Sequence, residues 1–168
     1  PLHAKEVTTP HLDALAKESV ICRQGYVTGN VCSPTRAGLM TGRYQQRLGL
    51  YTAGEAGSGV PMKEQIFPQF LKPAGYTSMQ IGKWHLGLGD PKPDWNGELK
   101  PGPLEIGFDH CLLLPTTNDR VPQVYVNDHR VRNLDPKDPL WVGDKAPDEN
   151  HPTGITHRDT LRMDWTHG

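Results

Sequence analysis

One stretch organises the sequence: Cys32-Ser33-Pro34-Thr35-Arg36-Ala37-Gly38-Leu39-Met40-Thr41-Gly42-Arg43. Proline is favoured at the first helical position, and a small polar residue before it can cap free amides. This order predicts a helix capped by Ser33, begun at Pro34 and ended by a left-handed Gly42. Cys32 is then expected just outside the helix N-terminus, where backbone N–H groups and the helix dipole favour an anion. Arg36, one turn into the helix, is expected to point back at the same place.

Size and composition allow one ordinary core and exclude several classes of protein. The chain has 168 residues, of which 35% are hydrophobic, and its formal net charge is −1. With no run of basic residues, no nucleic-acid partner is expected. No apolar stretch is long enough to span a membrane, and no signal peptide is visible. Because the sequence starts without methionine and ends without an evident closing element, we expect an interior piece of a longer protein.

The three cysteines differ in their surroundings. Cys22 and Cys111 each have aliphatic neighbours, which predicts two buried small hydrophobic side chains. No C-x-x-C spacing indicates a metal knuckle. Cys32 has polar neighbours and a helix start beside it, so we interpret it as the chemically active cysteine.

Apolar periodicity predicts an α/β fold. Helical spacing appears in residues 10–19 and 64–74, the second ended by Gly75 and disturbed by its two prolines. A short buried strand is expected over 20–22 and 26–27 and another at 76–82, so a helix is followed directly by a strand twice. A further strand at 111–114 and a hairpin at 124–131 follow. Residues 111–168 are otherwise rich in loops and proline, and we interpret His151, His157 and His167 there as loop residues.

A second stretch places two more polar groups at the end of a strand: Gly82-Lys83-Trp84-His85-Leu86-Gly87. If extended geometry persists, Lys83 and His85 lie on one face, at the strand end where open α/β sheets usually hold their sites. A surface lysine and a turn histidine remain the competing interpretation. A phosphate-binding loop is excluded, because Thr77 stands at a required glycine and Trp84 replaces the magnesium-binding hydroxyl.

These residues permit more than one enzyme. A cysteine phosphatase needs arginine six positions after the thiol, where this chain has Gly38. A thiol hydrolase built on Cys32 and His85 is allowed, since a helix N-terminus lowers a thiol pKa. It leaves Lys83 and Arg36 without a task on a neutral acyl group. Two cations and a helix N-terminus better suit a tetrahedral oxyanion, either sulfate or phosphate.

Both stretches resemble the signatures of the type I sulfatases. Residues 32–43 are similar to the first signature, built on C-x-P-x-R and a following T-G-R, and residues 82–87 to the second. Residues 9–13 and 107–109 also look like family segments. The resemblance implies a partial alkaline-phosphatase-like sandwich, with a mixed, mainly parallel sheet flanked by helices. Residues 1–168 would form an incomplete N-terminal part of the catalytic domain, with 1–110 belonging to its core.

The resemblance also implies a chemistry in which Cys32 is not used as a thiol. A formylglycine-generating or anaerobic sulfatase-maturating enzyme reads Cys32, Pro34 and Arg36 and oxidises the cysteine to formylglycine. Its hydrate, held on Ca²⁺ or Mg²⁺, attacks sulfur in a sulfated small molecule or glycan, and its second hydroxyl then expels sulfate. Arg36 would hold the hydrate oxygens. Lys83 and His85 would bind substrate, with His85 also accepting a proton.

The chain departs from the family in its metal ligands. The resemblance implies an Asp-Asp pair upstream, an Asp-Asn pair downstream and a later histidine and lysine, none of which is assignable here. Modified Cys32 is then the only metal ligand, so the isolated chain is expected to bind calcium poorly and to show no turnover. A phosphonate or phosphodiester hydrolase and a non-catalytic anion-binding homologue remain alternatives. A periplasmic, secreted or lysosomal location is implied by the resemblance alone.

Overall fold

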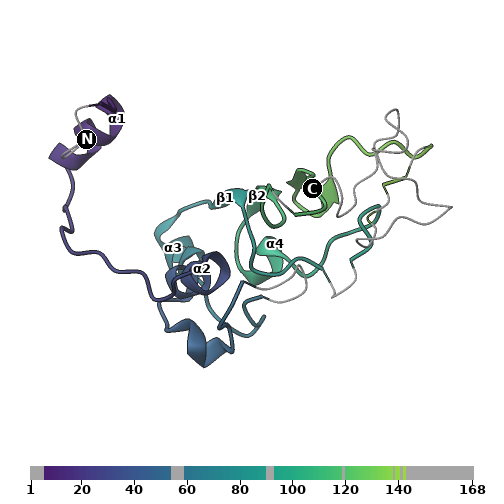
Figure 1. Ribbon diagram of the computed structural model, residues 1–168, viewed down its shortest axis with the longest axis horizontal. Helices are drawn as coiled ribbons and strands as arrows, with labels where there is room; N and C mark the ends of the chain where they lie inside the picture. The colour runs from purple at the N-terminus through teal and green to yellow at the C-terminus, as the bar shows by residue number, and fades with distance from the viewer. Residues whose placement is uncertain are drawn as a thin grey trace.

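The computed structural model describes residues 6–53, 59–89, 93–118, 120–137, 139–140 and 142. Their architecture is α/β, with short helices packed around a small mixed sheet (Figure 1). Three of the histidines noted above, at 151, 157 and 167, lie outside these residues. Within the described ranges, no helix has the length and apolar character needed to cross a membrane.

Four strands form the sheet, in the order β1-β2-β3-β4. Strand β1 (Met79–Lys83) pairs in parallel with β2 (His110–Leu114) over five residue pairs. The predicted hairpin is confirmed as β3 (Val126–Asn127) and β4 (Arg130–Val131), which continues the sheet with antiparallel pairings of two residue pairs each. The mixed sheet is thus confirmed, with its longest pairing parallel.

Helix α2 (Cys32–Thr41) begins two residues earlier than predicted. Val31 is its N-cap and Cys32 its first residue, so the expected cap by Ser33 is wrong. The Ser33 hydroxyl is buried and makes no hydrogen bond within the described residues. A proline third in the helix is tolerated, because first-turn N–H groups have no intrahelical partner. The predicted end is confirmed, since Gly42 has a left-handed φ of 65°.

The core lies between the sheet and the segments that lead into and out of it. Helix α4 (Pro103–Ile106) covers the start of β2, and Phe108 packs edge-on against Trp84 with 6.1 Å between ring centroids. Cys111 and Leu113 of β2 are fully buried, which confirms the prediction for Cys111. This packing fixes the position of Trp84 and with it the second signature stretch.

The periodicity of residues 64–74 corresponds to two shorter elements. Helix α3 (Phe67–Leu71) is followed by the 3₁₀ turn η2 (Lys72–Ala74), and Gly75 ends the segment with φ 85° as predicted. Each element starts with a proline within its first two residues, so the prolines divide the segment. The turn η1 (Gln45–Leu48) links α2 to this region.

The N-terminal segment has its predicted helix but not its predicted strand. Helix α1 (Pro10–Lys17) lies within the expected range. Residues 20–22 and 26–27 form no strand, and Val20 is 92% exposed, so the strand prediction there is wrong. The prediction that Cys22 is buried is also wrong, because its side chain is exposed. Aliphatic neighbours bury a cysteine only where a packing partner exists.

Candidate active site

Helix α2 presents Cys32 at its first turn. The backbone N–H of Ser33 and the Lys83 ammonium both act on the Cys32 sulfur. Burial tends to raise the pKa of this thiol, but these two groups outweigh it, so the pKa lies below its ordinary value of 9.0. The backbone N–H of Ser33 and the Lys83 ammonium thus both favour negative charge on the Cys32 sulfur.

The backbone changes direction at the end of strand β1, where Lys83 and His85 lie. Gly82 has φ 87° and His85 has φ 55°, so the chain leaves extended geometry around Lys83. The condition for the predicted alternation, that extended geometry persists to His85, is therefore not met, although Lys83 and His85 both reach Cys32. A left-handed histidine is uncommon and is kept only where its surroundings fix it.

The result is a close meeting of residues from the two signature stretches. The Sγ atom of Cys32 lies 3.2 Å from Nδ1 of His85, although the residues are 53 positions apart. His85 is almost fully buried, whereas Cys32 is partly exposed. A buried imidazole at this distance can hold or exchange a proton with the side chain at position 32.

Arg36 ties the two stretches together through the backbone. Its Nε donates to the carbonyl of Trp84 at 2.7 Å, and its Nη2 donates to the carbonyl of Lys83. Burial lowers the pKa of Arg36, and the nearby Cys32 acts in the opposite direction. Arginine stays charged in proteins, so a fixed positive charge lies beside the anion site. Its two bonds to carbonyls show a positioning task that the sequence did not indicate.

The family model described as Sulfatase matches residues 2–134, which is most of the chain. The chain belongs to the sulfatase family. The N-acetylgalactosamine-6-O-sulfatase of Bacteroides thetaiotaomicron is 38% identical over 165 residues, covering 95% of this chain and 32% of that protein. The human N-acetylgalactosamine-6-sulfatase is 37% identical over 134 residues, covering 70% of this chain and 24% of the relative.

Solved structures show that the sulfatase likeness extends to the fold. One, from work on the metabolism of multiple glycosaminoglycans by Bacteroides thetaiotaomicron, has a TM-score of 0.78 at 37% identity and covers 94% of this chain and 33% of its own. The putative sulfatase yidJ from Bacteroides fragilis has a TM-score of 0.51 at 29% identity, covering 72% of this chain and 29% of its own. The fold is therefore part of the alkaline-phosphatase-like sulfatase fold, and the chain spans about a third or less of these proteins.

The described part of this sulfatase chain does not by itself supply enough ligands for a divalent cation. No three histidine, cysteine, aspartate or glutamate side chains within it cluster as metal ligands. Calcium takes six to eight oxygen ligands, and Cys32 is the one predicted ligand at the site. A metal ion here would need carboxylates from beyond the described residues.

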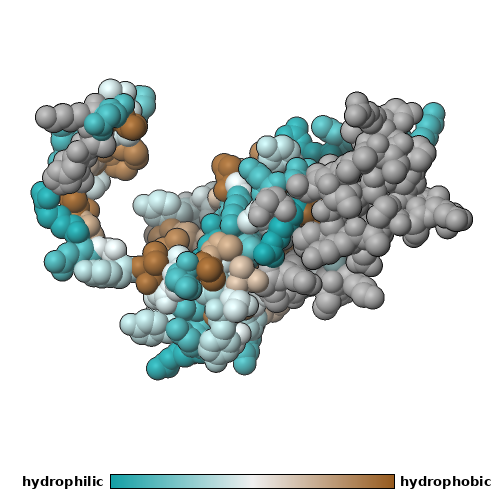
Figure 2. Space-filling view, viewed as in Figure 1, coloured by the Kyte–Doolittle hydropathy of each residue, from teal (hydrophilic) through white to brown (hydrophobic). Residues whose placement is uncertain are grey.

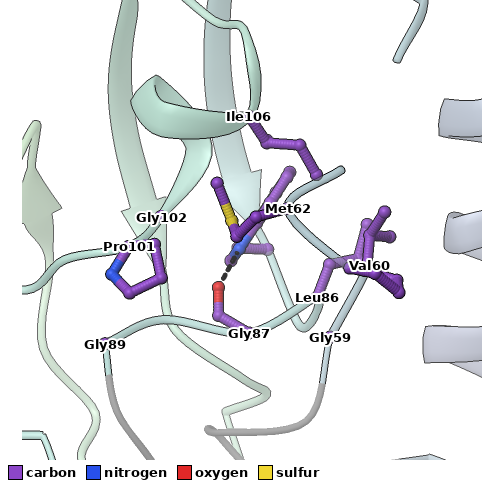
Figure 3. A pocket seen from close by; sticks show the side chains of 11 residues that line it. Gly59, Val60, Met62, Leu86, Gly87, Gly89, Pro101, Gly102 and Ile106 are labelled. Carbon is purple, nitrogen blue, oxygen red and sulfur yellow. Dashed lines mark hydrogen bonds between the residues drawn. The ribbon is translucent and has the colours of Figure 1, made fainter. Parts of the chain in front are cut away.

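A separate cavity of about 210 Å³ adjoins the second signature of the sulfatase (Figure 3). Val60, Met62 and Ile106 contribute side chains to its wall, and the Trp84 indole donates to the carbonyl of Gly87 at 2.6 Å. None of its lining side chains can titrate, and Cys32 is not among them. The cavity therefore offers shape but no acid–base chemistry.

The sequence interpretation missed Gln80 as part of the site region of the sulfatase. In the alternation of residues 76–82, Gln80 falls on the polar side and Met79 and Ile81 on the apolar side, but in β1 Gln80 is buried and Met79 and Ile81 are exposed. The Gln80 carboxamide lies 3.1 Å from the carbonyl of Lys83. A glutamine three positions before the motif lysine was the available signal, but its meaning depends on which strand face is covered.

Proposed function

We propose that this chain provides the nucleophile and the sulfate-binding groups of a sulfuric ester hydrolase longer than the chain itself. The supporting observation is the convergence of Cys32, Lys83 and His85, with 3.2 Å between the Cys32 Sγ and the His85 Nδ1. A cation, a buried imidazole and a helix N-terminus around one side chain suit a reaction on a tetrahedral oxyanion. Membership of the sulfatase family makes that oxyanion a sulfate ester.

We propose further that Cys32 works as formylglycine, made by a maturation enzyme that reads Pro34 and Arg36. One oxygen of the hydrated aldehyde would attack sulfur and displace the substrate alcohol. Loss of the proton from the second hydroxyl would then re-form the aldehyde and expel sulfate. Lys83 binds sulfate oxygens, which its interaction with the atom at position 32 supports. His85 orients that side chain and takes a proton from it.

We propose that Ca²⁺ or Mg²⁺ binds at this site only when further ligands come from outside the described residues. Such an ion stabilises negative charge on oxygen ligands. The positive charge that the described residues themselves bring comes from Lys83, Arg36 and the α2 N-terminus. No task assigned here to Lys83 or His85 depends on the ion.

We propose a sulfated carbohydrate as the natural substrate, with 6-sulfated N-acetylgalactosamine as the first candidate. Two relatives carry that specificity in their names, one of them 38% identical over 95% of this chain. Aryl sulfates serve as chromogenic substitutes, because cleavage takes place at the sulfate group that both classes share.

The test uses the full-length protein, coexpressed with a maturation enzyme. Mass spectrometry of the Cys32 peptide should show the aldehyde, and ion chromatography should show sulfate released from 4-nitrophenyl sulfate and from N-acetylgalactosamine 6-sulfate. Expression without the maturation enzyme provides the matched control, with a thiol at Cys32 and no turnover. Cleavage of bis(4-nitrophenyl) phosphate in preference to both sulfates would indicate a phosphodiester hydrolase instead.

A further inference from the structure

The turn at Lys83–His85 needs external support, because it is where β1 stops being extended. Gly82 and His85 both have positive φ, and for a histidine this conformation is uncommon and strained. Such a turn persists only where surrounding contacts determine it. The contacts that hold this turn therefore set where the Lys83 and His85 side chains point.

One side of the turn is held by the strand that pairs with β1. The backbone N–H of Trp84 donates to the carbonyl of Leu114, and that of His85 donates to the carbonyl of Pro115, each at 2.9 Å. These bonds extend the parallel pairing of β1 with β2 beyond the end of β1. These bonds hold the N–H groups of Trp84 and His85, whereas the carbonyls of Lys83 and Trp84 bind other groups.

The other side of the turn is held by side chains. Arg36 donates to the carbonyls of Lys83 and Trp84, and the Nε2 of Gln80 donates to the same Lys83 carbonyl at 3.1 Å. A carbonyl oxygen has two lone pairs, so both donors are accommodated. Nε2 of Gln80 also lies 3.3 Å from the carbonyl of Ile81. The glutamine thus bridges the last regular part of β1 and the turn.

Burial makes this bridge specific. Gln80 is 7% exposed, and burying a carboxamide is unfavourable unless it is hydrogen-bonded. An apolar side chain of similar size would fill the same space at a strand position that favours such residues. The carboxamide contributes what that side chain cannot, which is a donor aimed at the Lys83 carbonyl.

We propose that Gln80 is a positioning residue of the active site: together with Arg36, its carboxamide holds the backbone carbonyl of Lys83, so that Lys83 and His85 both face Cys32. The expected effect of Gln80 on catalysis rests on the proposed sulfatase function. Its expected effect on the turn at Lys83–His85 does not. Gln80 touches no reacting atom in this role and acts through the placement of Lys83 and His85.

The structural arm of the test is hydrogen exchange in the full-length protein, which does not depend on turnover. Gln80→Met keeps the side-chain volume and removes the donor. We expect the amides of Trp84 and His85 to exchange about tenfold faster, the effect of losing one hydrogen bond, while the β1–β2 ladder amides stay within about twofold. Unchanged exchange at both amides, or a uniform increase throughout the sheet, would overturn the proposal.

The matched control is Gln45→Met. Gln45 is also buried and donates from Nε2 to the carbonyl of Thr28 at 2.7 Å, so this variant also loses a carboxamide bonded to backbone. We expect it to lower thermal stability to a similar degree and to leave exchange at Trp84 and His85 as in the wild type. Faster exchange at these amides in both variants would mean that the turn responds to general destabilisation, against a specific role for Gln80.

The kinetic arm measures kcat and KM for an aryl sulfate per folded, formylglycine-containing protein. A slight misplacement of catalytic groups lowers kcat more than binding, so Gln80→Met should lower kcat about tenfold and change KM by less than about threefold. Gln45→Met should keep kcat within about twofold of the wild type. An unchanged kcat in Gln80→Met contradicts the proposal. If the wild type releases no sulfate at all, the proposed function fails, and the exchange arm still decides the role of Gln80.

Discussion

Helix α1 and strand β2 were both predicted from their apolar residues, but only β2 is buried. Helical spacing predicted α1 and a continuous apolar run predicted β2. Leu113 of β2 is fully buried, whereas Leu12 and Leu15 of α1 are 64% and 60% exposed. In Figure 1, α1 stands apart from the rest at the end of an extended segment, and Figure 2 shows apolar patches on it and over the α2–α3 region. Periodicity therefore predicts which face of an element is apolar, but burial depends on a partner surface.

The largest effect is expected in the packed region that contains β2, at Cys32, the proposed nucleophile. Cys32→Ala in the full-length protein should lower sulfate release by about a thousandfold or more, because the proposed nucleophile is lost. Ion chromatography of released sulfate measures this. Cys22→Ser, in the exposed N-terminal segment, is the matched control and should retain near wild-type turnover. Comparable losses in both variants would show that the N-terminal segment also builds the site.

A smaller effect is expected from the cation beside the nucleophile. Lys83→Ala should lower kcat/KM by about a hundredfold, the typical effect of removing one group that stabilises a developing oxyanion. Lys100→Ala removes an exposed lysine whose ammonium is paired with Glu98 at 3.1 Å, and should leave kcat/KM within about twofold. Initial rates with 4-nitrophenyl sulfate measure both. Equal losses would assign the effect of Lys83 to net charge rather than to its place.

The well-packed region also predicts how stability depends on pH. The pKa of Asp109 is lowered from 3.8 to about 2 by the backbone N–H of Ser78, by Lys72 and by the Ser78 hydroxyl. The unfolded carboxylate then binds a proton more readily than the folded one, so the stability it contributes is complete above its unfolded pKa and is lost as pH falls toward about 2.

Urea unfolding over this acidic range measures the effect, with Asp109→Asn as the comparison. The variant should be less stable near neutral pH and show a shallower loss of stability on acidification. An identical slope in both proteins would contradict the assignment to Asp109.

The smallest effect on stability is expected in helix α1. Leu15→Ala in the 168-residue chain should change the free energy of unfolding by about 0.5 kcal/mol or less, because this side chain is exposed. Leu113→Ala, in the buried strand, should cost about 2–5 kcal/mol. Denaturant titrations compare the two. A large loss in Leu15→Ala would show that α1 packs on the rest of the chain after all.

Local signals predicted the elements whose causes are local. The left-handed glycines at 42 and 75 end their helices as expected, because a chain reversal there needs positive φ. The hairpin at β3–β4 is likewise local, with Asp128 in a left-handed turn position. The two signature stretches were found for the same reason, since each is a continuous motif.

The predictions that failed depended on surroundings. The prediction of a strand over 20–22 and 26–27 was wrong, because an apolar run needs a neighbour to pair with. The prediction that Ser33 caps α2 was wrong, because Val31 takes that position and the helix begins at Cys32. The strand pattern of β1 was found, but which of its faces is covered was not.

The sequence by itself determined the kinds of chemical group that this sulfatase chain brings: a thiol, a guanidinium, an ammonium and an imidazole, in two motifs. Only the tertiary structure determined that these groups lie close together around Cys32. Residues 53 positions apart are joined at 3.2 Å because Gly82 and His85 turn the chain out of β1, while Arg36 and Gln80 hold the carbonyl of that turn. Side-chain alternation is a local property of a strand. The hydrogen bonds that hold the turn come from Arg36 on helix α2 and from Gln80 on the buried face of β1.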